Sequence, residues 1–101
     1  MTDAFAALAD PTRRRIVELL RDGELDAGAI ADEFDISKPA ISRHLRILRT
    51  AGVVSVRPAA QRRVYALRRG GLDDVGAWVD RDRSYWHDRL EDLQSLVEEE
   101  T

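Results

Sequence analysis

The sequence predicts a mainly α-helical domain with one small β-hairpin. Apolar residues recur at spacings of three and four along most of the chain, which indicates amphipathic helices. One stretch, residues 53–68, instead alternates apolar and polar residues on either side of a turn. The 101 residues contain no internal repeat and no linker, so we expect a single domain over residues 1–101.

The composition excludes several classes of protein. Hydrophobic residues make up 44% of the chain and charged residues 35%, a balance typical of a globular protein. Cysteine is absent, which excludes disulfides, thiolate metal sites and cysteine nucleophiles. There is no apolar run of about 18 residues and no N-terminal leader pattern. We therefore expect a cytoplasmic protein that makes no contact with a membrane.

The first two helices are expected on either side of an Asp-Pro-Thr sequence. A short helix should run from about residue 3 to residue 9, with Phe5 and Leu8 three positions apart. Asp10 can cap a second helix that begins at Pro11, where the missing N–H of proline costs nothing.

The next two helices have the spacing of a helix-turn-helix over about residues 27–51. Asp26 can cap a helix that ends near Phe34, and after a short turn Ser37 can cap a second helix that ends at Gly52. The second helix is apolar on one face. Its other face carries Lys38, Ser42, Arg43, Arg46 and Arg49. In this motif the second helix lies in the major groove of DNA.

A basic hairpin follows directly and makes the motif winged. Val54 and Val56 begin the first strand, Val64 and Tyr65 lie in the return strand, and residues 58–61 are the expected turn. The basic residues near the tip are Arg57, Arg62 and Arg63.

A long final helix is expected over about residues 72–98, after Gly70-Gly71. It would be about 40 Å long, more than so small a domain can cover. Part of its apolar stripe should therefore pack against a second chain. The stripe residues expected in this dimer interface are Leu72, Val75, Val79, Trp86, Leu90, Leu93 and Val97.

The charge distribution points to a polyanionic partner. The net charge is −3, yet residues 37–69 contain nine basic residues and no acidic one. A charge run is usually a solvated face, but a run with no counter-charge favours a surface for nucleic acid. The alternative is a winged-helix interaction module that binds an acidic protein. It is disfavoured because Tyr65 is the single aromatic residue of this region.

These residues resemble the ArsR/SmtB family of winged-helix repressors. The resemblance rests on FAALADPTRRRIVELL from Phe5, on IADEFDISKPAISRHLRILRTAGVVSVR from Ile30, and on RRVYAL from Arg62. Its most specific part is the pattern S-x-H-L-x-x-L-x-x-A-G at residues 42–52. It implies a homodimer held by the first and last helices, which adds Phe5 and Leu8 to the interface, on a palindromic operator in double-stranded DNA. The basic pattern and the resemblance together predict these DNA-binding residues: Ser37, Lys38, Pro39, Ser42, Arg43, His44, Arg46, Arg49, Arg62 and Arg63.

The departures from the family pattern bear on regulation. Family members that sense metals use a cysteine pair on the helix before the turn, or carboxylate and histidine ligands on the last helix. This chain has no cysteine, and its last helix has one histidine, His87. We therefore expect a repressor with no metal and no cofactor, and the sequence names no effector. A ligand- or metal-responsive sensor of the same family is the alternative. Catalysis is not expected, since the two histidines lack catalytic partners and no phosphate-binding loop is present.

Three further points stay open at the level of sequence. His44 can pack against the core or contact a phosphate. The arginines at positions 13–15 can form a salt-bridged surface, which we favour, or contact phosphates. The wing tip, Ala60-Gln61, lacks the glycine that the family often has there.

Overall fold

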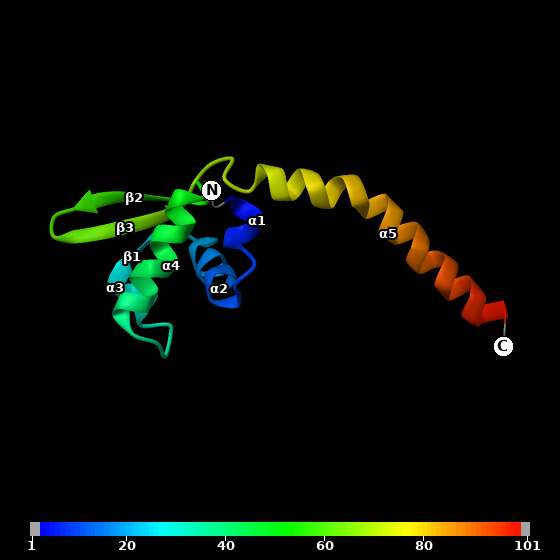
Figure 1. The fold of residues 1–101 in the computed structure, drawn as a ribbon, viewed down its shortest axis with the longest axis horizontal. Helices are drawn as coiled ribbons and strands as arrows, with labels where there is room; N and C mark the ends of the chain where they lie inside the picture. Colours follow the sequence, from blue (N-terminus) through cyan, green and yellow to red (C-terminus); the bar gives the residue numbers. More distant parts are fainter. Residues whose placement is uncertain (1–2, 100–101) are drawn as a thin grey trace.

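The computed structural model describes residues 3–99, with side chains to residue 96. Four helices and a three-stranded sheet form a body, and one long helix extends from it (Figure 1). The mainly helical class with a hairpin is thereby confirmed. The elements in order are α1 (Ala4–Ala7), α2 (Pro11–Leu20), β1 (Leu25–Asp26), α3 (Ala27–Ala31), α4 (Lys38–Thr50), β2 (Val54–Ala59), β3 (Arg62–Leu67) and α5 (Asp73–Glu99).

The three predicted helix caps are confirmed. A side-chain oxygen of Asp10 accepts a hydrogen bond from the Arg13 backbone N–H at 3.1 Å, and the equivalent bonds of Asp26 and Ser37 measure 2.7 and 3.2 Å. Each satisfies an N–H that the first helical turn leaves without a partner. These caps fix where α2, α3 and α4 begin.

Helices α1 and α3 are shorter than predicted. The expected ends were near residues 9 and 34, whereas the helices stop at Ala7 and Ala31. The backbone N–H groups of Ala9 and Phe34 each bond to the carbonyl three residues earlier. Such tighter turns are common where a helix unwinds, and sequence periodicity does not distinguish them from a final α-helical turn.

The sheet contains one strand more than predicted. Strand β3 is central, and it pairs antiparallel with β2 and with the two-residue strand β1. In the hairpin Ala59 faces Arg62, so the turn is Ala60-Gln61 alone and not the four residues expected. Ala60 has φ +58°, a conformation that normally favours glycine.

The core lies between α2, α3, α4 and the sheet, and it leaves α5 largely outside. Ile16, Ile30, Leu48 and Val53 are fully buried at its centre. From Trp78 onward α5 runs away from the body, which gives the chain an extent of 64 × 27 × 26 Å (Figure 1).

The exit of α5 from the body depends on one glycine. A Cβ at Gly71 would lie 2.6 Å from the carbonyl oxygen of Gly52. The chain can therefore pass this point only because residue 71 has no side chain.

Candidate nucleic-acid interface

One face of α4 is exposed and cationic. Three side chains of this helix, Ile41, Leu45 and Leu48, are buried in the core. The opposite face carries Lys38, Ser42, Arg43, Arg46 and Arg49, all exposed. Within residues 3–99, none of these four cations forms an ion pair. Their charge is therefore available to an external anion.

The wing and α4 share a groove. It lies between them and is lined by Ser42, Arg46 and Arg49 from α4, by Arg63 from β3, and by Ala27, Leu45 and Tyr65 at its base. Because residues alternate sides along a strand, Arg63 and its neighbour Arg62 point to different faces of β3. The α4–wing groove thus collects three arginines that the sequence distributes over 18 residues.

The other two arginines of the wing are paired with acids, which corrects the expectation of an uncompensated basic region. Arg57 donates to both carboxylate oxygens of Glu24, at 2.6 and 3.3 Å. An oxygen of Asp26 lies 3.5 Å from the guanidinium of Arg62. The pairs form because β1 brings residues 24–26 alongside β3.

The Glu24–Arg57 pair also changes the acidity of both groups. The hydrogen bond from Arg57 lowers the pKa of Glu24, and the same bond raises the pKa of Arg57. Both groups therefore stay charged at neutral pH, and Arg57 can reach a phosphate only after it leaves Glu24.

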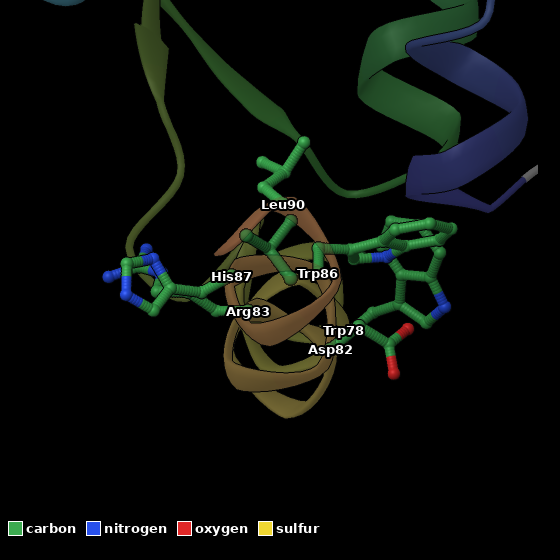
Figure 2. A pocket seen from close by; sticks show the side chains of 7 residues that line it. Trp78, Asp82, Arg83, Trp86, His87 and Leu90 are labelled. Carbon is green, nitrogen blue, oxygen red and sulfur yellow. The ribbon is translucent and has the colours of Figure 1, made fainter. Parts of the chain in front are cut away.

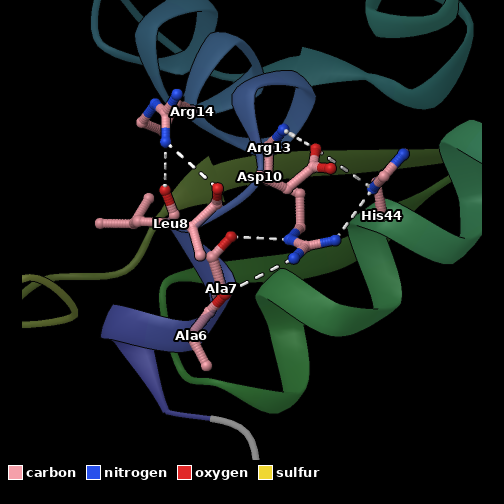
Figure 3. A network of polar contacts seen from close by, with 8 residues as sticks. Ala6, Ala7, Leu8, Asp10, Arg13, Arg14 and His44 are labelled. Carbon is pink, nitrogen blue, oxygen red and sulfur yellow. Dashed lines mark hydrogen bonds and ion pairs between the residues drawn. The ribbon is translucent and has the colours of Figure 1, made fainter.

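His44 faces the interior instead of the groove. Its ring is 8% exposed, and its Nδ1 lies 3.2 Å from a guanidinium nitrogen of Arg13 and 3.9 Å from a carboxylate oxygen of Asp10 (Figure 3). An arginine can only donate, so in a hydrogen bond between these two groups Nδ1 is the acceptor. The structure favours the packed alternative for His44, and we leave it out of the proposed interface.

Arg13 connects α1, α2 and α4. Besides His44, its guanidinium donates to the carbonyls of Ala7 at 2.6 Å and Ala6 at 3.5 Å (Figure 3). These carbonyls lie at the end of α1, where no further helical turn supplies donors. Arg14 donates to the next two carbonyls, those of Leu8 and Ala9.

The expected salt-bridged surface is therefore confirmed only for Arg15, which pairs with Glu18 at 3.3 Å. Asp10, at the start of α2, is affected by the same network. Burial acts to raise the pKa of Asp10, but the backbone N–H and the charge of Arg13 outweigh it, so the pKa lies below its ordinary value.

Comparison with known proteins identifies the family. Residues 10–56 match the model of bacterial regulatory proteins of the arsR family. The chain is 43% identical over 97 residues to the HTH-type transcriptional regulator Rv2034 of Mycobacterium tuberculosis, covering 96% of this chain and 88% of that protein. The chain belongs to the ArsR family. It is therefore a DNA-binding transcriptional regulator and not an enzyme, as the sequence predicted.

Two further similarities support this membership. The ArsR-family chain is 46% identical over 79 residues to the transcriptional repressor SdpR of Bacillus subtilis, covering 78% of this chain and 88% of that one. The solved structure of a possible transcriptional regulator for arsenical resistance superposes with a TM-score of 0.77 at 40% identity, covering 94% and 96% of the two chains.

The residues predicted for the dimer interface of this ArsR-family protein fall into two groups. Leu72 and Val75 are half-buried and pack against the core of their own chain. Phe5 of α1 contacts the Trp78 ring edge-to-face, with centroids 6.2 Å apart, and Leu8 is half-buried. Phe5 itself is 45% exposed, and the other predicted side chains are exposed as well: Val79 by 41%, Trp86 by 58%, Leu90 by 64% and Leu93 by 60%. The side chain of Val97 lies outside the described residues.

Neither a metal site nor a membrane span is found in the described part of the chain. No group of three His, Cys, Asp or Glu side chains among residues 3–99 is placed to hold a metal ion. His87, the histidine of α5, lies 3.0 Å from Glu91 one turn along the same helix. No helix within residues 3–99 is long and apolar enough to cross a membrane.

Proposed function

We propose that this ArsR-family regulator acts in the cytoplasm as a homodimeric repressor of a palindromic operator. The observation that carries the proposal is the exposed face of α4, whose cations have no ionic partner among the residues that the structure describes. The two copies of α4 would enter successive major grooves about 34 Å apart. Repression is supported by the name of the Bacillus subtilis relative, which is a transcriptional repressor.

The contacts we propose divide by position along α4. Helix N-termini approach the base edges in this mode of binding, so Lys38, Pro39, Ser42 and Arg43 are assigned to bases, with Ser37 beside them at the cap. Arg46, Arg49 and Arg63 line the α4–wing groove and are assigned to phosphates. Arg62 joins them after it exchanges Asp26 for a phosphate.

The test begins with binding to random duplex DNA, measured by fluorescence anisotropy over a range of salt concentrations. Affinity should fall steeply with salt, because each neutralised phosphate releases counterions. Selection from a random library then yields the operator. On that operator Arg43→Ala should cost about 1–3 kcal/mol and relax the base preference near its contact.

Arg81→Ala on α5 is the matched control, since it removes the same charge far from α4 and should leave the base preference unchanged. If Arg43→Ala weakened all sequences equally, Arg43 would be a phosphate contact and the assignment would be wrong. An absence of binding even at low salt would instead mean that the α4 face serves an acidic protein.

A further inference from the structure

One large apolar side chain is exposed outside α1 and α5. Among residues 3–96, the other exposed large apolar side chains lie on those two helices, and Figure 2 shows Trp78, Trp86 and Leu90 projecting from α5. Ile36 is the single exception, because it lies in the turn between α3 and α4 and is 44% exposed. A lone exposed apolar residue is common on protein surfaces, so the exposure of Ile36 assigns it no role without its position.

The position of Ile36 is directly beside the residues assigned to base edges. It precedes Ser37, the cap of α4, and Lys38, the first residue of that helix, and both of these side chains are exposed. The Ser37 hydroxyl accepts a hydrogen bond from the Ala40 backbone N–H at 3.2 Å, which fixes the chain at this point. In the proposed mode of binding the start of α4 approaches the base edges. Docking of α4 therefore brings Ile36 to the bases as well.

Packing within the protein accounts for only part of the Ile36 side chain. Ile36 and Ile41 hold the position before the cap and the fourth position of the helix, two places whose apolar side chains often pack against each other. Ile41 is 2% exposed and belongs to the core. A contact with Ile41 would use the inner side of Ile36, and the 44% that remains exposed is free to contact a partner.

The chemistry of the major groove offers one apolar partner for this surface. Base pairs present hydrogen-bond donors and acceptors there, and their one apolar group is the 5-methyl of thymine. A phosphate is a poor partner, because the exposed carboxylate of Asp35 precedes Ile36 in the same turn and would repel it. We propose that Ile36 is a specificity-determining residue that packs against the 5-methyl group of one thymine in each operator half-site. This inference rests on the proposed function and adds to it a residue and the base that it reads.

Removing the methyl group from the DNA tests the contact without changing the protein. Each thymine of a half-site of the selected operator is replaced in turn by uracil, which keeps the hydrogen-bonding groups and lacks the 5-methyl. At one position binding should weaken about fourfold, the factor that corresponds to about 0.8 kcal/mol for one buried carbon group. The same change in both half-sites should weaken binding about 15-fold, since distant sites act independently. At that position 5-bromouracil, whose bromine takes the place of the methyl, should restore the affinity.

Variants of the protein then assign the methyl contact to a residue. Ile36→Ala should bind the thymine and uracil operators equally in fluorescence anisotropy, because the side chain that distinguishes them is absent. Ile36→Val keeps a branched apolar side chain and should still prefer thymine. Ser42→Ala is the matched control, since it changes an exposed residue also assigned to bases and should keep the preference for thymine at this position. Urea unfolding of each variant shows whether it folds as the natural protein does.

The outcomes separate this inference from the proposed function. If no thymine were sensitive to loss of its methyl, or if Ile36→Ala kept the full preference for thymine, the contact would be refuted while operator binding by α4 stood. If Ile36→Ala lowered the stability and left operator binding unchanged, Ile36 would serve only the packing of α4, which also refutes it. A natural protein that selects no operator would overturn the proposed function and this inference together.

Discussion

Replacing Arg13 tests whether one half-buried arginine secures α1 to α4. Its guanidinium donates at 2.6 Å to the carbonyl of Ala7, a residue with no exposed surface, and lies 3.2 Å from Nδ1 of His44, which is 8% exposed. Arg13→Ala leaves both acceptors without this donor, and a buried unsatisfied acceptor costs about 1–3 kcal/mol. Since Arg13 is itself half-buried, water can enter in part. We expect a loss of about 2–4 kcal/mol in the free energy of unfolding.

Arg14→Ala is a close control. Arg14 also donates to carbonyls at the end of α1, at 2.9 and 3.3 Å, but these bonds are exposed to solvent. Its removal should cost about 0.5 kcal/mol or less. Arg13→Lys should fall between the two, because one ammonium group cannot reproduce the planar fork that reaches both acceptors.

The assay is urea unfolding followed by circular dichroism, at one fixed protein concentration because association contributes to the measured stability. Equal losses for Arg13→Ala and Arg14→Ala would refute the reasoning. They would mean that water satisfies the Ala7 carbonyl and His44 as well as Arg13 does.

Three further predictions concern the wing and the start of α2. Ala60→Gly should stabilise the protein by about 0.5–1 kcal/mol in thermal unfolding, because glycine relieves the positive φ at 58°; Gln61→Gly, at a residue without a positive φ, should not stabilise it. Glu24→Gln and Asp26→Asn should each tighten binding to random duplex DNA and steepen its salt dependence by up to about one counterion, because each frees a wing arginine; unchanged slopes would remove these arginines from the interface. The pKa of Asp10 lies below 3.8 in the folded protein, so its carboxylate contributes stability that is present above that pH and lost as the pH falls through the folded pKa. Acid titration of the unfolding free energy should therefore show a steeper fall for the natural protein than for Asp10→Asn.

The features that the sequence predicted are local ones. The caps Asp10, Asp26 and Ser37 act on N–H groups three residues away, and the apolar face of α4 follows from a spacing within one helix. Such features depend on neighbouring residues, so a reading along the chain can find them.

The features that it missed join distant segments. Strand β1 has two residues, too few to show an alternating pattern, and it exists because β3 offers it an edge. Glu24 and Arg57 are 33 residues apart, and Arg13 and His44 are 31 apart. No rule of sequence spacing connects residues so far apart. For this reason the charge distribution along the chain predicted that Arg57 and Arg62 would have no acidic partner, whereas both are paired.

The difference between paired and unpaired arginines bears on how DNA would be recognised. A phosphate that recruits Arg57 or Arg62 must displace a carboxylate that already holds it, so the net gain is smaller than for a free cation. Arg43, Arg46 and Arg49 have no ionic partner among the described residues, so a phosphate can bind them without displacing a carboxylate. Arg57 and Arg62 should therefore add little affinity for arbitrary DNA. In the proposed interface, discrimination between sequences therefore rests on the N-terminal residues of α4, which are assigned to base edges, while Arg46, Arg49 and Arg63 supply attachment to phosphates.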